Sequence, residues 1–161
     1  MPWIYAVNIT REGGDFVVSV RDLPEVCTSG DTLERALDLA ADAVDVVVCH
    51  RIEKGKELAA PSAPLSGEYE AVLPFQTAAK ATLYQIWRAS GVSKSELARR
   101  MGLGETEVRR ILDPHHSTRP MTLDATAKAL GYRLVMAPGR QDVKPDKPHN
   151  TRTKPTTRAA E

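Results

Sequence analysis

Aromatic side chains, cysteines and long apolar runs are all scarce in this chain. Aromatic residues make up only 5% of its 161 residues, so a globular core has to be built mostly from aliphatic side chains. The two cysteines, Cys27 and Cys49, are too few for a disulfide framework and lack the paired spacing of a metal site, which favours a reducing cytoplasm. The most apolar run, residues 43–49, is too short to cross a bilayer and contains Asp45. We therefore expect a cytoplasmic protein with no signal peptide, membrane segment, metal ion or other cofactor.

Charge is present in quantity but is unevenly distributed. Residues 1–76 carry 6 basic and 13 acidic side chains, a net charge of −7. Residues 77–137 carry 10 basic and 5 acidic side chains, a net of +5, and residues 138–161 carry 6 and 3, a net of +3. This asymmetry predicts one half that suits a basic partner and another that suits a polyanion.

The first 74 residues are predicted to form a small sheet with one long helix. Residues 4–10 and 16–20 are rich in β-branched side chains and flank the turn-forming residues 12–15, which indicates a hairpin. Residues 25–29 and 69–73 are expected to add strands. Asp31 and Glu34 have the spacing of a capping box, and apolar residues then recur every three or four positions, which predicts a helix from residue 33 to about 54.

Residues 75–137 are predicted to form an all-α domain that begins after Pro74. Helices are expected over residues 78–89, 94–101 and 105–112, and a fourth, capped by Thr122, is expected to end at Gly131. Residues 132–136 are predicted to form a short strand that either closes this domain or pairs with a second copy as a dimer seam. Residues 138–161 are basic, rich in proline and poor in large apolar side chains, so we expect a disordered tail.

Residues 93–112 have the spacing of a DNA-reading helix-turn-helix. Ala98 lies where two helices cross closely, Gly102 lies where the chain turns, and Val108 and Ile111 face inward from the second helix. The exposed residues of that helix can contact base edges in the major groove, and the start of the first helix suits a phosphate oxygen. The predicted DNA-binding residues are Ser93, Lys94, Glu105, Thr106, Arg109 and Arg110. The alternative is an ordinary pair of packed helices with a solvated basic face, and Gly104 departs from the usual Ser or Thr cap.

The first half contains an ordered set of residues: Tyr5-Ala6, Gly13-Gly14, Asp22-Leu23-Pro24-Glu25, Thr28-Ser29-Gly30-Asp31-Thr32, Glu34, Ala36, Ala40 and Pro61-Ser62. This set resembles the N-terminal domain of HicB-type antitoxins. The resemblance spans residues 3 to about 74. It implies a degraded ribonuclease H-like fold without catalytic function, a partner in the form of a small basic HicA-type toxin that cleaves RNA, and repression of the toxin–antitoxin operon by the second domain.

Acidic residues of the first domain are the candidates for contact with such a toxin. Asp38, Asp42 and Asp45 are spaced to share one face of the long helix, and Asp22, Glu25 and Asp31 are expected to cluster in the loops before it. Carboxylates in such an arrangement can imitate RNA phosphates and pair with basic residues of the toxin. The alternative is that the aspartates form the solvated side of an amphipathic helix.

These patterns predict an α+β binding protein and not an enzyme. The leading hypothesis is an antitoxin that inhibits a HicA-type ribonuclease and, as a homodimer or homotetramer, represses its own operon by binding operator DNA. A second hypothesis is a transcription regulator whose first domain senses a ligand or mediates oligomerisation. A third, a metal-dependent nuclease, needs converging carboxylates with one on the first strand, and residues 4–10 contain none.

Overall fold

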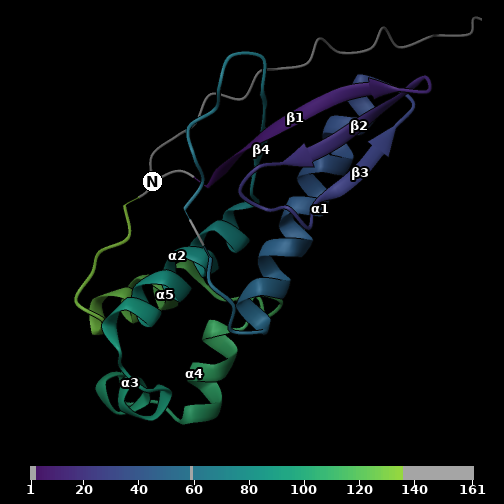
Figure 1. Cartoon of the computed structure of the whole chain (residues 1–161). Helices are drawn as coiled ribbons and strands as arrows, with labels where there is room; N and C mark the ends of the chain where they lie inside the picture. The colour runs from purple at the N-terminus through teal and green to yellow at the C-terminus, as the bar shows by residue number, and fades with distance from the viewer. Residues whose placement is uncertain (1–2, 59, 136–161) are drawn as a thin grey trace, which may run out of the picture.

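The computed structural model describes residues 3–58 and 60–135, which form an α+β body (Figure 1). Four strands, β1 (Ile4–Glu12), β2 (Asp15–Val20), β3 (Cys27–Gly30) and β4 (Tyr69–Val72), pair antiparallel in the order β3-β2-β1-β4. Five helices follow the first three strands: α1 (Leu33–Glu53), α2 (Phe75–Ser90), α3 (Lys94–Met101), α4 (Glu105–Leu112) and α5 (Pro120–Ala129). The predicted tail, residues 138–161, lies outside the described residues.

The β1–β2 hairpin forms where the sequence predicts it. Glu12 pairs with Asp15, so Gly13 and Gly14 alone make the loop, with φ values of +59° and +105°. Two-residue hairpin loops require positive φ, which glycine adopts without steric cost. The third strand begins at Cys27, two residues later than predicted, because the chain turns through Pro24 and Glu25 first.

Helix α1 packs on one face of the sheet and forms the first core with it. The helix contributes small and β-branched side chains, and the two central strands contribute alternating residues from the same face of the sheet. Fully buried members are Ala36, Ala40, Val44 and Val48 of α1 with Tyr5, Val7 and Val18 of the sheet. The N-cap of α1 is Thr32, whose side chain accepts a hydrogen bond from Arg35 N. The predicted capping box places the cap at Asp31, one residue too early.

Helix α2 belongs to both halves of the molecule. Ala81 and Tyr84 are buried in the sheet core, whereas Leu83 is buried against Ile111, Leu123 and Ala127 of the helical half. Trp87 packs at the edges of the sheet core and of a third cluster around Leu97 and Val108. Figure 1 shows α2 lying between the sheet layer and the remaining helices. The expected boundary after residue 74 therefore marks the start of a shared helix.

The structure corrects two predicted helix starts and one predicted strand in the helical half. Helix α2 starts at Phe75, directly after Pro74, and not at residue 78. Helix α5 begins at Pro120, which suits the first helical position because its missing N–H needs no partner there, so Thr122 lies inside the helix and does not cap it. Residues 132–135 are not in a strand; Leu134 packs against the cluster around Leu123 instead, and Met136 lies outside the described residues.

Candidate nucleic-acid and protein interfaces

Helices α3 and α4 form the pair that the sequence predicts. Ser93 caps α3, with its Oγ accepting from Glu96 N at 3.1 Å, and Gly102 ends α3 with φ +66°. Gly104 caps α4 without a side-chain hydrogen bond, so its departure from Ser or Thr leaves the first turn unassisted. The inward-facing assignments are confirmed, because Leu97, Ala98, Val108 and Ile111 are all buried.

The outer face of α4 carries the predicted reading residues. Thr106, Arg109 and Arg110 are exposed, and Glu105 is half-buried. Arg109 is not free: its Nη2 donates to Glu105 Oε1 at 2.6 Å, while Ser95 Oγ donates to Glu105 Oε2 at 2.6 Å. These hydrogen bonds, first from Ser95 and then from Arg109, lower the pKa of Glu105. The carboxylate of Glu105 therefore holds Arg109 in place, and the contacts of Glu105 with Ser95 and Arg109 compete with the DNA contact predicted for it.

Arg110 lines a groove beside α4. The groove has a volume of about 470 Å³, and its lining includes Thr106, Arg110, His116 and Arg119. Lys94, at the start of α3, lies 5.4 Å from the centroid of the Trp87 ring, a cation–π contact that leaves its charge near the surface. Among the predicted residues, Ser93 and Lys94 thus lie at the start of α3 and the other four on α4.

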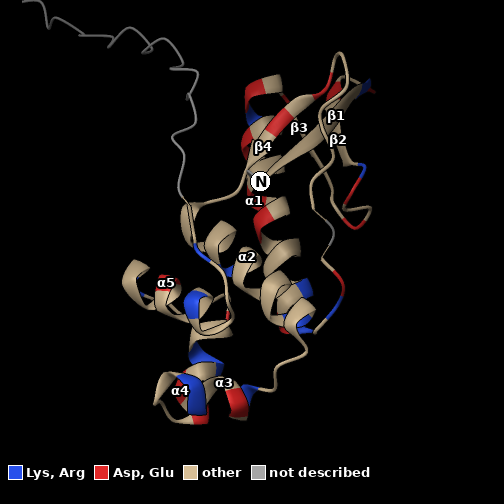
Figure 2. Ribbon diagram, turned by 90° about the vertical axis from the view of Figure 1, so that its left-hand side faces the viewer, with Lys and Arg blue, Asp and Glu red and all other residues tan. Residues whose placement is uncertain are grey.

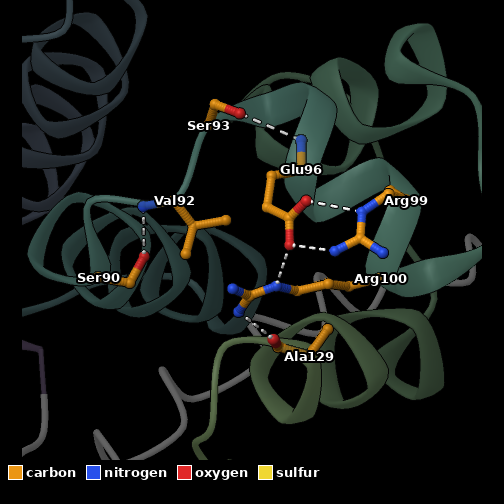
Figure 3. Close-up of polar contacts among 7 residues, drawn as sticks. All are labelled: Ser90, Val92, Ser93, Glu96, Arg99, Arg100 and Ala129. Atoms are coloured by element: carbon orange, nitrogen blue, oxygen red, sulfur yellow. Dashed lines mark hydrogen bonds and ion pairs between the residues drawn. The ribbon is translucent and has the colours of Figure 1, made fainter.

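An ion-pair cluster on α3 is linked to α5 through Arg100 (Figure 3). Glu96 accepts hydrogen bonds from Arg99 Nε at 2.8 Å and from Arg100 Nε at 2.9 Å, and Arg100 Nη1 donates to the Ala129 carbonyl. The bonds from Arg99 and then Arg100 lower the pKa of Glu96 to about 2. Figure 3 shows the carboxylate of Glu96 turned toward the two arginines and away from Ser93. Arg100 is therefore partly committed to joining α3 to α5, whereas Arg99 pairs with Glu96 within α3.

Lys80 is a structural residue that sequence reasoning missed. It lies on α2 with 1% of its surface exposed, and its Nζ donates to the Ile111 carbonyl, to Thr118 Oγ1 at 2.7 Å and to the Arg110 carbonyl at 3.3 Å. Burial lowers the pKa of Lys80 to about 8, while the nearby Asp113 carboxylate acts in the opposite direction. The lysine thus donates to carbonyl groups in the last turn of α4, where the Arg110 carbonyl also accepts from Asp113 N.

The six predicted acidic contacts do not form one cluster. Glu25 pairs with Arg51, with Oε2 and Nη2 2.7 Å apart, which places it near the C-terminal end of α1. Asp31 directly precedes the opposite end of that helix, and the 18 residues between Leu33 and Arg51 span about 27 Å at the ordinary helical rise. The expected grouping of Asp22, Glu25 and Asp31 is therefore wrong, because a turn and a strand separate Glu25 from Asp31.

Two of the loop acids serve the fold directly. Asp22 accepts from Ser62 N at 2.8 Å and from Ser62 Oγ at 2.7 Å, which ties the segment before β4 to the end of β2. The hydrogen bond from Arg51 lowers the pKa of Glu25. On α1, Asp38 and Asp42 are exposed, whereas Asp45 is half-buried and its Oδ1 has no hydrogen-bond partner among the described residues. Of the six predicted acidic contacts, Asp31, Asp38 and Asp42 are thus the exposed ones on α1 and just before it.

Charge is segregated between the two halves of the fold. Figure 2 shows Asp and Glu concentrated around the sheet and α1, and Lys and Arg gathered on the helical half that contains α3 and α4. Within residues 3–58 and 60–135, no group of three or more His, Cys, Asp or Glu side chains is arranged to hold a metal ion. Cys49 is buried in α1, and burial raises the pKa of its thiol. No helix in the described part of the chain is both long enough and apolar enough to cross a membrane.

One α+β body thus carries an acidic sheet half and a basic helical half. The profile of a family described as HicB_like antitoxin of bacterial toxin-antitoxin system matches residues 4–82. Antitoxin HicB 1 of Photorhabdus laumondii subsp. laumondii is 36% identical over 126 residues, which cover 78% of this chain and 80% of that protein. Antitoxin HicB of Pseudomonas fluorescens is 35% identical over 135 residues (83% and 92%), and Antitoxin HicB of Escherichia coli K12 is 33% identical over 134 residues (82% and 96%). The chain belongs to the HicB-like antitoxin family.

Membership in this family gives the chain the role of an antitoxin in a bacterial toxin–antitoxin system. The family is not enzymatic, so the chain is a binding protein and not a nuclease. The family profile ends at residue 82, inside α2, so it covers the sheet, α1 and the first half of the shared helix. The aligned segments of the three relatives extend well beyond that point, because each covers more than three quarters of the chain.

Proposed function

We propose that this antitoxin binds and inhibits a HicA-type ribonuclease toxin through the sheet and α1, and represses its own operon through α3 and α4. The single observation that carries the proposal is the division of charge within one family member: a net of −7 over residues 1–76 and +5 over residues 77–137. A ribonuclease that binds RNA requires a basic surface, which an acidic domain can cover. The sheet with one long helix on one face is consistent with a reduced ribonuclease H-like fold.

The geometry of α3 and α4 supports the DNA-reading part of the proposal. Both helices are short, they are separated by Gly102, Leu103 and Gly104, and the buried residues of one pack against those of the other. Thr106, Arg109 and Arg110 remain exposed on the second helix, where a helix-turn-helix presents its base-reading side chains. Arginine held by a neighbouring carboxylate is well suited to a bidentate contact with guanine, because less side-chain entropy is lost on binding.

The accessible acidic residues narrow the proposed toxin surface. Asp22 and Glu25 are engaged by Ser62 and Arg51, so their first role is to hold the loops in place. Asp31, Asp38 and Asp42 are exposed along the first half of α1 and the turn before it. We propose that these three carboxylates face the basic surface of the toxin, and that Asp45 contributes less because it is half-buried.

Charge reversal tests this toxin surface. Purified antitoxin carrying both Asp31→Lys and Asp42→Lys is titrated into an RNA-cleavage assay with a HicA-type toxin, and inhibition should weaken by at least tenfold. The matched control is Glu57→Lys, which makes the same type of charge change at an exposed position beyond the other end of α1. Equal inhibition by wild type and the double variant would remove this face from the toxin interface.

Enrichment of duplexes from a random pool tests the DNA-reading part. The wild-type protein should select a two-fold-related sequence, because one short helix covers only a few base pairs and a dimer reads two half-sites. The selected duplex should compete for binding with the fragment upstream of the antitoxin reading frame. Failure to enrich any sequence would mean that α3 and α4 are an ordinary packed pair.

We propose that the DNA-binding form is a homodimer or homotetramer. Apolar side chains are exposed on α5 and in the segment after it, with exposed fractions of 84% for Met121 and 88% for Val135. Such residues suit burial against a second copy. Light scattering on wild type and on Met121→Glu should show loss of the oligomer in the variant. A monomeric wild type at micromolar concentration would contradict this assignment.

A further inference from the structure

Helix α2 sends one charged side chain into the helical half, and that side chain ends at α4. Lys80 is 1% exposed, and its ammonium group reaches two backbone carbonyls of α4 and the hydroxyl of Thr118. An ammonium group has three donors, and Lys80 uses them on three acceptors. The two carbonyls, of Arg110 and Ile111, belong to the last turn of the helix, where the partial negative charge of the helix dipole is concentrated.

Burying the ammonium group of Lys80 removes it from water, which costs free energy. An apolar side chain at this position would pack without that desolvation cost. The neighbouring cluster of Leu83, Ile111, Leu123 and Ala127 already supplies apolar contacts between α2, α4 and α5. Such contacts hold a helix in place but are non-directional, so they leave its rotation and its position along the axis weakly specified. Directional hydrogen bonds to the backbone of α4 specify both. Buried polar groups are a known means of fixing one register among several packed alternatives.

We infer that Lys80 is a positioning residue for DNA reading: from α2, it sets the rotation and depth at which α4 presents Arg109 and Arg110. The inference rests on the proposed DNA-reading function of α4. Because Thr118 accepts from the same ammonium group, Lys80 also holds the loop that carries His116 and Arg119 along the groove beside α4. Through α2, which packs on α1, the position of the reading helix is tied to the sheet half of the chain.

The first test compares affinity for DNA with stability. Lys80→Met keeps the unbranched shape and removes the three donors, and it should lower affinity for the duplex selected by wild type at least tenfold in fluorescence anisotropy. The matched control is Val18→Ala, which removes buried volume from the sheet core at β2, a strand that pairs with β1 and β3. The control should lose as much thermal stability and bind the duplex within twofold of wild type, when both variants are assayed well below their melting temperatures.

The second test measures how the affinity for DNA depends on pH. If residue 80 had only a structural role, this affinity would not change with pH. As pH rises from 7 to 9.5, the ammonium of Lys80 loses one of its three donors, so wild-type affinity should fall while the affinity of Lys80→Met stays flat. The other titratable and charged groups around the site are Asp113 and Arg110 at the end of α4, His116 in the loop, and Cys49 of α1, whose thiol pKa is raised by burial. All of them are unchanged in Lys80→Met, so the pH profile of that variant is the control for them.

A third variant keeps the inference testable if Lys80→Met does not fold. Thr118→Val removes one buried acceptor of the network and should weaken binding severalfold when assayed well below its melting temperature. The positioning role would be overturned if Lys80→Met, or Thr118→Val in its place, bound the duplex as tightly as wild type and with the wild-type pH profile. A wild-type protein that enriches no duplex would overturn the DNA-reading function itself, and the inference with it.

Discussion

Replacing Gly30 with alanine should destabilise the sheet half by forcing two backbone segments apart. Gly30 ends β3, and a Cβ built there would lie 2.6 Å from Ala36 N and 3.0 Å from both Ala36 Cα and Arg35 C. All three atoms are backbone atoms of the first turns of α1, so no side-chain rotation can relieve the overlap. Ala36 N also donates to the Thr32 carbonyl at 2.9 Å, a bond that a shift of the helix would lengthen.

The size of the effect follows from three contributions. Overpacking a buried site costs about 1–3 kcal/mol. Weakening one backbone hydrogen bond adds about 1 kcal/mol. Alanine lowers the entropy of the unfolded chain relative to glycine, which offsets at most about 1 kcal/mol. The expected loss is therefore roughly 2–3 kcal/mol, or a decrease in melting temperature of roughly 4–12 °C for a chain of this size.

Urea unfolding followed by far-UV circular dichroism measures this loss. The control is Gly104→Ala, because φ at Gly104 is −76° and a Cβ there has nothing within 4 Å. The control should lose about 1 kcal/mol or less, because alanine is a poorer N-cap than glycine but meets no steric contact at this position. A Gly30→Ala protein as stable as the control would refute the close contact between β3 and α1.

Three further predictions concern charged groups. Arg109→Ala should cost roughly 1–3 kcal/mol of binding at the selected duplex in a gel-shift titration, and an unchanged midpoint for both Arg109→Ala and Arg110→Ala would exclude α4 as the reader. Glu96→Gln should make the melting temperature depend less on pH in the acid range. Because the pKa of Glu96 is lowered to about 2, the stabilisation by its carboxylate is fully present above the ordinary pKa of 4.5 and is lost as pH falls through 2. Melting temperatures measured from pH 7 to pH 2 check this, and parallel curves for wild type and variant would contradict it. Asp22→Ala should destabilise by about 1–3 kcal/mol through loss of its bonds to Ser62. Urea midpoints test this last effect, and an unchanged midpoint would show that the contact is not needed for folding.

Local signals explain why much of the fold was predictable. The Gly13-Gly14 pair can satisfy a positive-φ hairpin loop, and the three- and four-residue spacing in α1 and α4 marks their buried faces. The buried positions of α3 and α4 were predicted correctly for the same reason. Element starts were less predictable because several residues compete for a cap: Thr32 prevails over Asp31, and Arg119 with Pro120 precedes Thr122.

Long-range pairings were not predictable from the sequence. The expected cluster of loop acids fails because Asp22 finds its partner 40 residues away in Ser62, and Glu25 finds Arg51 at the end of α1. Lys80 gives no signal at all, since its main partners are backbone carbonyls 30 and 31 residues away, and a carbonyl has the same chemistry at every position. A lysine in an otherwise helical, partly apolar segment is indistinguishable from a solvated one until the packing of α4 against α2 is known.

The shared helix α2 bears on how toxin and DNA binding would influence each other. The two halves share no flexible linker at residue 74, because α2 starts directly after Pro74 and contributes buried residues to the cores of both. A toxin that shifts α1 against α2 would therefore move the anchor of α4, whereas a toxin that leaves α2 in place would leave the reading helix unchanged. Coupling between two binding sites is reciprocal. If toxin changes the affinity for operator DNA by some factor, operator DNA must change the affinity for toxin by the same factor. In Lys80→Met, which lacks the hydrogen bonds from α2 to α4 but keeps their apolar contact, that factor should move toward one.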